Sequence, residues 1–446
     1  MSVTHRRAVS AGIAATALAV LAACGQVPAE QEDDEPAAPT PAAGPVEVST
    51  LDPRVVLTYD GGLMTLDTGT GEVLDDLPLD GFLRVNPAGD GRHVLISTDE
   101  GFRAYDAGLE ARGHGDHFHY YASPPAITDT LLPAERAGHV VTHAGRTALF
   151  ADGTGEVQVI DPAALVDGAP PTDTWRAPDP HHGVAVELAD HSLVVSVGTE
   201  EGRTGAVLLD AERRELARTE DCPGLHGEAT ARDEVVVLGC EDGPVILRQG
   251  EFTKVAVDGE YARSGNLAGH PGSAVVLGDY KTDPDAELER PEQVALIDTT
   301  EVSLRLVDLD ASYSFRSLGR GPGGEALVLT TDGTLRILDE DSGAELDRVA
   351  VTEPWEEPDD WQQPRPALHV VDGVAYVTDP AADRLHTVGI SMGTVVRSYD
   401  LPHTPNEIAV ATGFGAHDVA DHDDAEHDGH DHADHGDAEE HAEHDH

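Results

Sequence analysis

The chain has 446 residues, of which 84 are acidic and 28 are basic, so its formal net charge at pH 7 is −56. Binding to nucleic acid requires clustered lysine and arginine that neutralise phosphates, and this charge balance therefore excludes nucleic acid as a partner. The acidic composition favours solubility and attracts cations, but it does not by itself identify a ligand.

Residues 1–23 predict the signal peptide of a lipoprotein. Arg6 and Arg7 precede an apolar stretch at 8–20 that is too short to span a bilayer. The stretch ends in Leu-Ala-Ala-Cys, which resembles the bacterial lipobox, where the signal is cut before the cysteine and the cysteine receives a lipid. We therefore predict an exported protein that Cys24 anchors to the outer face of the cytoplasmic membrane, at the cell surface or in the periplasm. The alternative is ordinary cleavage, with Cys24 as a simple thiol.

The residues after Cys24 are expected to be soluble. No other apolar run approaches about 18 residues, the length at which a membrane-spanning helix is considered. Residues 24–46 are rich in proline, alanine and acidic side chains, and we interpret them as a disordered tether.

Residues 47–414 predict a single all-β domain. Short β-rich runs alternate with turns, 46 glycines and 29 prolines punctuate the chain, and helical periodicity is nearly absent. A typical piece, EALVLTTDGTLRILDEDSGAELDRV at 325–349, gives a strand, an Asp-Gly hairpin turn, a second strand, another turn and a third strand.

This unit recurs roughly every 44 residues, a period typical of a β-propeller. A β-helix would need shorter repeats, and separate sandwiches would need linkers.

The first run, 55–77, lacks an inner strand, and the last, 406–413, lacks the strands that should follow it, so we predict that the N- and C-terminal strands pair and close the ring. Eight blades are predicted, or seven if the weak repeat at 267–309 is miscounted. The innermost strands are expected to start near Phe82, Gly138, His182, His226, Leu267, Arg316, Leu368 and Asn406.

The densest histidine cluster of this domain is GHGDHFHY at 113–120. In a strand, His117 and His119 would lie on one face and could share an ion, while in a loop Asp116 could join them. His114 adds a third imidazole, and neutral imidazole is the commonest protein ligand for zinc. The alternative is chance clustering or a hydrogen-bonding role at the surface.

A second group appears when the repeats are aligned. His182 and His226 each precede a glycine at the start of an innermost strand, His139 starts another such strand, and His403 precedes the closing one. Because side chains at these starts converge on the mouth of a propeller's channel, they predict a metal site of three or four ligands. The alternative is that each is a turn histidine bonded to nearby backbone.

Two cysteines remain once Cys24 is lipidated. Cys222 and Cys240 form an even pair in an oxidising compartment, which predicts a disulfide. A thiolate metal site is the alternative, although neither cysteine has a partner at Cys-x-x-Cys spacing.

Residues 415–446 form a different kind of segment, with nine histidines among aspartate, glutamate and glycine. Such a sequence lacks the apolar side chains needed to fold, and we predict a disordered tail that captures metal ions loosely. Soft thiolate ligands are absent, which disfavours Cu(I), whereas ligand type does not separate zinc from nickel, cobalt or Cu(II). The expected low-affinity tail ligands are His422, His427, His430, His432 and His435.

Four segments carry a resemblance to a known family. They are GHGDHFHYY at 113–121, PHHGVAVELAD at 180–190, CPGLHGEA at 222–229 with the later Cys240, and LPHTPNEIAV at 401–410. They resemble the AztD-type zinc metallochaperones, extracytoplasmic β-propellers that hand zinc to the solute-binding protein of a zinc ABC importer. The resemblance implies the same fold, the same Zn²⁺ cargo and the same partner here, and the lipobox and tail would suit a Gram-positive cell that tethers its chaperone. The ligands it implies are His117, His119, His182, His226 and His403, with Asp116 and His139 in support.

Three functions are compatible with these features. The first is a zinc chaperone or reservoir, expected to act as a monomer, in which tail and loop histidines capture Zn²⁺ and the channel-mouth site holds it until a partner takes it. The second is a propeller enzyme of the lactonase or dehydrogenase type, and the third is an interaction scaffold. The sequence has no GxSxG, Walker, GxGxxG or HExxH motif, so no catalytic residue is expected. The abundance of histidine favours the chaperone.

Overall fold

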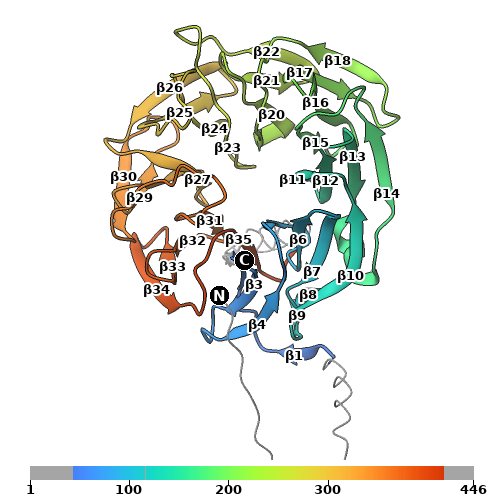
Figure 1. Ribbon diagram of the computed structural model, residues 1–446, viewed down its shortest axis with the longest axis vertical. Helices are drawn as coiled ribbons and strands as arrows, with labels where there is room; N and C mark the ends of the chain where they lie inside the picture. The colour runs from blue at the N-terminus through green and yellow to red at the C-terminus, as the bar shows by residue number, and fades with distance from the viewer. Residues whose placement is uncertain (1–43, 116, 416–446) are drawn as a thin grey trace, which may run out of the picture. The chain divides into compact units, whose positions relative to one another are not determined.

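Eight antiparallel sheets of four strands each follow one another around a ring in the computed structural model (Figure 1). The structure describes residues 44–115 and 117–415, all of which belong to one compact unit. The predicted all-β propeller with eight blades is therefore confirmed, and the alternative of seven blades is excluded. No predicted start of an innermost strand differs from the observed start by more than three residues.

The blades follow the chain in order, and each begins with its innermost strand. Blade 1 contains β5 (Arg84–Pro87), β6 (His93–Thr98), β7 (Gly101–Asp106) and β10 (Ala126–Pro133), and blade 2 contains β11 (Ala137–His143), β12 (Arg146–Ala151), β13 (Glu156–Ile160) and β14 (Thr172–Arg176). Blade 3 contains β15 (Ala185–Glu187), β16 (Leu193–Thr199), β17 (Gly202–Leu209) and β18 (Glu215–Thr219). Blade 4 contains β19 (Glu228–Ala231), β20 (Val235–Leu238), β21 (Val245–Arg248) and β22 (Glu251–Lys254).

The second half of the ring repeats this order and then closes on the N-terminal strands. Blade 5 contains β23 (Leu267–Ala268), β24 (Val275–Asp279), β25 (Gln293–Asp298) and β26 (Ser303–Asp308); blade 6 contains β27 (Tyr313–Arg320), β28 (Ala326–Thr330), β29 (Thr334–Leu338) and β30 (Glu345–Ala350); blade 7 contains β31 (Leu368–Val371), β32 (Val374–Asp379), β33 (Arg384–Gly389) and β34 (Thr394–Asp400); and blade 8 contains β35 (Ile408–Ala411), β2 (Arg54–Tyr59), β3 (Gly62–Asp67) and β4 (Val73–Pro78).

Blade 8 joins the two ends of the domain, as predicted. The C-terminal strand β35 pairs antiparallel with β2, so that Val410 lies opposite Val55 and Ile408 lies opposite Leu57. Val55, Leu57 and Val410 then enter a core cluster that also holds Tyr376 of blade 7. The closing strand thus completes both a sheet and the contact between two neighbouring blades.

Burial within a blade depends on the position of the strand. The middle strands are covered on both faces by adjacent blades, so strands such as β2 (RVVLTY) and β16 (LVVSVGT) are continuous apolar runs that are buried almost throughout. The outermost strands have one solvated face, and β4 (VLDDLP) alternates strictly between partly buried and exposed residues. This difference explains why the middle strands stand out most clearly in the sequence.

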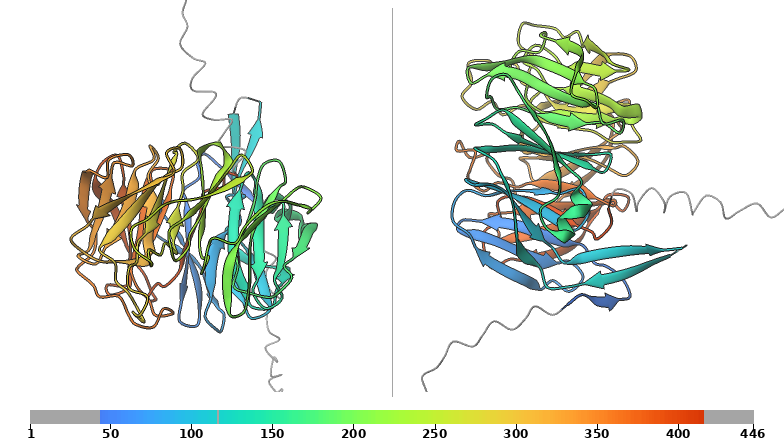
Figure 2. Two further views of the ribbon diagram at one scale, coloured as in Figure 1. Left: turned by 90° about the horizontal axis from the view of Figure 1, so that it is seen from above. Right: turned by 90° about the vertical axis from the view of Figure 1, so that its right-hand side faces the viewer.

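A three-stranded sheet is inserted in blade 1, between β7 and β10. It consists of β8 (Leu109–His114), β9 (His117–Ala122) and the first described strand, β1 (Val46–Val48), which pairs with β9. The strands β5 and β7 are both antiparallel to β6, so β7 ends on the face of the ring where the innermost strands end. The insertion leaves the ring from that face and projects away from it (Figure 2).

The predicted disulfide is present. Cys222 and Cys240 are bonded and fully buried, and they flank the β19–β20 hairpin of blade 4. Because both sulfurs are used in this bond, the alternative of a thiolate metal site is excluded. The bond fixes the base of the loop that carries His226, whose backbone N–H donates to the carbonyl of Gly239 at 3.0 Å.

Two short 3₁₀ helices, η1 (Pro162–Asp167) and η2 (Arg232–Glu234), complete the described elements. Within the described ranges, no helix has the length and apolar character needed to cross a membrane. The predicted signal peptide, the lipidated Cys24, most of the tether and the tail from 416 onward lie outside the described residues, so these assignments stay predictions.

We predict that closure of the ring dominates the stability of the domain. Ala409 of β35 is fully buried against the neighbouring blade, and an Ala409→Asp substitution would place a carboxylate there without a partner. The expected loss of unfolding free energy is about 3 kcal/mol or more. Urea unfolding should reveal it, whereas the matched change Val396→Asp on exposed β34 should leave stability within about 0.5 kcal/mol. Equal effects of the two changes would contradict the prediction.

Candidate metal centre

Two groups of three histidines bring their ring nitrogens together in the part of the chain that the structure describes. One consists of His114, His117 and His119, and the other of His139, His182 and His226. Within each group the potential ligand atoms all lie within 4.8 Å of one another. We call the first group the hairpin site and the second the channel site.

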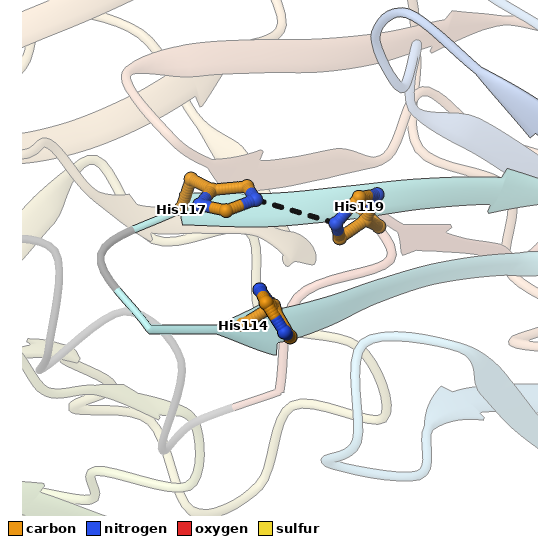
Figure 3. Close-up of side chains that lie close together, drawn as sticks. All are labelled: His114, His117 and His119. Carbon is orange, nitrogen blue, oxygen red and sulfur yellow. Dashed lines mark hydrogen bonds between the residues drawn. The ribbon is translucent and has the colours of Figure 1, made fainter.

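The hairpin site lies at the tip of the β8–β9 hairpin (Figure 3). His114 ends β8 and is paired across the turn with His117, and His119 lies two residues further along β9, on the same face. The Nε2 atoms of His117 and His119 are 3.3 Å apart, and the three ring centroids are 5.0 to 5.7 Å from one another. His114 and His117 are exposed to solvent. The hairpin therefore presents three imidazoles to an ion that arrives from outside.

Strand β1 orients one of these rings. Glu47 accepts a hydrogen bond from Nδ1 of His119, with Oε1 at 2.8 Å. Because Nδ1 carries the proton in this bond, Nε2 is left as the lone-pair atom, and it is the nitrogen that lies beside Nε2 of His117. A carboxylate behind a ligating histidine is a common arrangement in zinc sites.

The channel site is assembled from three consecutive blades. His139 lies in β11, while His182 and His226 lie just before β15 and β19, so each comes from the start of an innermost strand. The Nε2 atoms of His139 and His182 are 3.3 Å apart, and the ring centroids of the three histidines are 5.0 to 5.3 Å from one another. All three side chains are partly buried.

Glycines beside these histidines permit close backbone approach. A Cβ on Gly138 would lie 2.2 Å from Oδ1 of Asp152, and one on Gly227, whose φ is +83°, would lie 2.5 Å from the carbonyl oxygen of Gly265. The register of β11 against β12 also shifts between Ala137 and Val140, the stretch that contains His139. The Gly-His and His-Gly pairs in the sequence thus serve the site.

Hydrogen bonds that Nδ1 donates orient two of the channel histidines. Nδ1 of His182 donates to Oδ2 of Asp152 at 2.6 Å, and Nδ1 of His226 donates to the backbone carbonyl of Gly265 at 2.7 Å. Both rings are thereby held in the tautomer whose Nε2 has a free lone pair. Oε2 of Glu228 lies 3.7 Å from Nδ1 of His139, beyond hydrogen-bond distance.

Burial keeps His139 and His226 neutral when the site holds no ion. The pKa of His139 is lowered from 6.5 to about 3, mainly because the ring is buried and also because His182 lies close to it. Burial and the neighbouring His139 lower the pKa of His226 from 6.5 to about 3. Burial also raises the pKa of Glu228 from 4.5 to about 8. Neutral imidazole is the form that binds a metal, so protons compete weakly for these two rings near neutral pH.

Two buried carboxylate oxygens indicate that the channel site fits a cation. Oδ1 of Asp152 and Oε2 of Glu228 have no hydrogen-bond partner within the described structure. Leaving such atoms without a partner is costly, and a positive ion among the three imidazoles would favour their charged forms. The donor set of three imidazoles with carboxylates behind them suits zinc.

The structure separates the remaining predicted ligands from these groups. His403 is not part of the channel site, because its Nε2 contacts Oδ2 of Asp76 at 2.9 Å and its ring stacks on Tyr59, with centroids 3.9 Å apart. This histidine precedes the closing strand, but its side chain turns toward the outer strand β4 instead of the centre. Asp116 lies outside the described residues.

Sequence reasoning missed the residues that orient the ligands. In the sequence, Glu47 only marks the start of the domain, and Asp152 belongs to an Asp-Gly pair that predicts a turn. Glu228, which lies near His139 without a hydrogen bond to it, follows His226 by two residues in LHGEA and is the one of these groups that the histidine pattern marks in the sequence. The acceptor provided by Gly265 is a backbone carbonyl, which carries no sequence signal.

The two sites lie on opposite faces of the ring. The channel site is built at the starts of innermost strands, whereas the hairpin leaves blade 1 where those strands end. An ion at one site is therefore not shared with the other. The chain offers two separate places at which histidines could hold a metal.

No family model matches the chain. The zinc chaperone AztD of Citrobacter koseri is 28% identical over 336 residues, which cover 71% of this chain and 77% of that protein. The chain resembles AztD. The resemblance that four short segments predicted is therefore confirmed over most of the domain.

Solved structures of AztD from the same organism share the fold. The crystal structure of AztD is 23% identical with a TM-score of 0.70 and covers 83% of this chain and 99% of that one. The structure of apo AztD is 22% identical with a TM-score of 0.69, covering 81% of this chain and 98% of that one. Nearly the whole length of AztD thus has a counterpart in this propeller.

The lowered pKa values of the channel histidines predict a pH dependence of stability in the metal-free protein. Unfolding returns the pKa of His139 and of His226 from about 3 to about 6.5, so between these pH values the unfolded chain binds more protons than the folded one. Their contribution to stability is complete above about pH 6.5 and is lost as the pH falls toward 3, by about 1.4 kcal/mol per pH unit for each proton.

Urea unfolding in the presence of a chelator, at pH values from 7 to 4, measures this slope. The double variant His139→Ala/His226→Ala should show a shallower loss of stability between about pH 6 and 4 than the unaltered protein. The raised pKa of Glu228 acts in the opposite direction, so Glu228→Gln should steepen the loss in the same window. Identical slopes in all three proteins would contradict the assignment.

Proposed function

We propose that this protein is an exported zinc chaperone that carries Zn²⁺ at the channel site and at the hairpin site. The observation that supports this most directly is the channel site, where three imidazoles from three blades meet and two of them are oriented through Nδ1. Chance does not explain three such rings at equivalent positions of successive repeats. The similarity to a protein named as a zinc chaperone supports the same cargo.

The channel site would hold its ion firmly and still allow transfer. Three protein nitrogens leave one position of a tetrahedral zinc ion for water or for a ligand from another protein. A partner that supplies this fourth ligand could then replace the histidines one at a time, without release of free zinc. His139, His182 and His226 would be the ligands, and Asp152 and Gly265 would orient two of them.

The hairpin site would exchange zinc more readily. Its histidines lie at the tip of the projecting β8–β9 hairpin and two of the three are exposed, so an ion there would be accessible to solvent and to partners. Solvated ligands hold a cation less tightly than ligands that burial has preorganised. We assign capture to the hairpin and storage to the channel.

The partner and the compartment follow from the AztD resemblance and the predicted signal. We infer that the acceptor is the solute-binding protein of a zinc ABC importer, and that the chaperone works outside the cytoplasmic membrane as a monomer anchored through Cys24. The related protein is named as a chaperone, which supports binding and transfer of the ion over catalysis. The name of the related protein also favours zinc over nickel, cobalt or Cu(II) as the cargo.

Zinc binding by variants of the two sites tests the proposal. In protein that ends at Gly415, competition with a chelating dye should detect two ions per chain. His182→Ala should remove the channel ion, and His117→Ala should remove the hairpin ion, because each leaves only two of three imidazoles. The matched change His403→Ala, which removes a histidine from neither group, should retain both ions.

Asp152→Asn gives a finer test at the channel site. It keeps all three ligands but weakens the acceptor for Nδ1 of His182, and zinc affinity is expected to fall about 10- to 100-fold. If all tight zinc is lost when residues 416–446 are removed, the propeller does not carry the specific site and the proposal is wrong.

A further inference from the structure

One ligand of the channel site lacks the support that the other two have. Nδ1 of His182 donates to Asp152, and Nδ1 of His226 donates to the carbonyl of Gly265. For Nδ1 of His139, the described residues provide no hydrogen bond. Its Nε2 nevertheless lies 3.3 Å from Nε2 of His182. Two nitrogens at about 2.0–2.1 Å from a tetrahedral zinc ion are about 3.4 Å apart, so the ring is already at ligand spacing and only its far side is unsupported.

Glu228 lies on that unsupported side. Its Oε2 is 3.7 Å from Nδ1 of His139, which is about 0.8 Å longer than a hydrogen bond of about 2.9 Å. The residue begins β19, two positions after His226, so the strand that follows one ligand also carries the carboxylate behind another. A small tilt of either side chain would close the gap. Glu228 does not belong to the group whose ligand atoms converge, so it stands behind a ligand and not among the ligands.

The position of Glu228 is unfavourable in the metal-free protein. Its Oε2 is shielded from solvent and has no hydrogen-bond partner in the described part of the chain. A shielded carboxylate without a partner destabilises a fold. Glu187, at the end of another innermost strand, is also buried, but its Oε2 lies 2.7 Å from Nη2 of Arg213. A local arrangement that destabilises the fold, as at Glu228, is expected where a residue serves function.

A zinc ion would complete the arrangement. A metal bound at Nε2 withdraws electron density from the ring, so Nδ1–H becomes a stronger donor and its contact with a carboxylate becomes more favourable. The positive charge of the ion also favours a charged carboxylate nearby. Asp152 already has this relation to His182. Glu228 would have it to His139 once the ion is bound.

We propose that Glu228 is a positioning residue of the channel site, which accepts a hydrogen bond from Nδ1 of His139 when zinc binds and thereby retains the ion. The contact forms with the ion and opens when the ion leaves, so Glu228 couples the fixation of one ligand to the occupancy of the site. This inference rests on the proposed function, since it requires the channel site to bind zinc.

The test measures zinc affinity and metal-free stability in three variants of the full-length chain. Each carries His117→Ala, which removes a ligand from the hairpin site, and the reference is the chain with His117→Ala alone. The C-terminal segment is present in all of them, so its contribution is the same. Glu228→Gln keeps the size of the side chain but removes its charge, and Glu228→Ala removes the acceptor altogether. The matched control is Glu187→Gln, which changes a buried and ion-paired glutamate on another innermost strand.

Glu228→Gln should lower zinc affinity about 10- to 100-fold in competition with a chelating dye. Glu228→Ala should lower it at least as much. The visible absorption of bound Co²⁺ should keep its shape in Glu228→Gln, because the three nitrogen ligands remain. A changed spectrum would show that Glu228 is itself a ligand, and unchanged zinc affinity in both variants would show that it takes no part. Either result would overturn the inference.

Thermal unfolding in the presence of a chelator gives the second readout, which should move in the opposite direction. Glu228→Gln should raise the midpoint by about 2 °C or more, because the amide has no charge to desolvate. Glu187→Gln should lower the midpoint, because it breaks an ion pair, and should leave zinc affinity unchanged. An unchanged or lower midpoint for Glu228→Gln would assign this residue a structural role and overturn the inference.

The variant His182→Ala, in the same His117→Ala background, separates this inference from the proposed function. It should remove tight zinc binding, because it leaves two of the three channel ligands. If zinc binding stays intact in this variant, the channel is not a site, and the failure belongs to the proposed function.

Discussion

Closure of the ring by β35 is the constraint on which the rest of the structure depends. The middle strands of each blade are buried on both faces, and this is achieved only because every blade has two neighbours. The pairing of β35 with β2 gives blade 8 its innermost strand and covers blade 7 through contacts with Tyr376. An open array would expose an apolar face at each end, so the innermost strands hold their positions only in the complete ring.

That ring places two histidine clusters with different physical character. The channel cluster is made of residues that are about 43 positions apart in the chain, and its geometry depends on three blades at once. Burial there lowers the pKa of His139 and His226 to about 3, which leaves them neutral and ready to bind a cation. The hairpin cluster is local, exposed and built by two paired strands. In the proposed function, firm holding belongs to the channel cluster and ready exchange belongs to the hairpin cluster.

Neighbouring groups determine what these histidines can do. Asp152 and the carbonyl of Gly265 hold two channel rings in the tautomer that exposes Nε2, and Glu47 does the same for His119 in the hairpin. The unpartnered oxygens of Asp152 and Glu228 would be unfavourable without a cation nearby. Similarity to AztD extends over most of the domain, and the orienting groups are the part of this chain's own geometry on which the proposed zinc binding depends.

The sequence by itself determined the propeller and its ring closure, favoured eight blades over seven, and predicted the disulfide. It also named all six clustered histidines as candidates, four of them as ligands that the resemblance implies, with His139 in support and His114 in the same segment as His117. These features are readable because strand alternation, Asp-Gly turns and a repeat of constant length are local patterns. Only the tertiary structure decided that His403 turns away to Asp76, and that Asp152, Glu228 and Gly265 stand behind the channel ligands. The physical reason is that these contacts join different blades, and the rotation between blades sets which side chains meet without leaving a pattern in any one repeat.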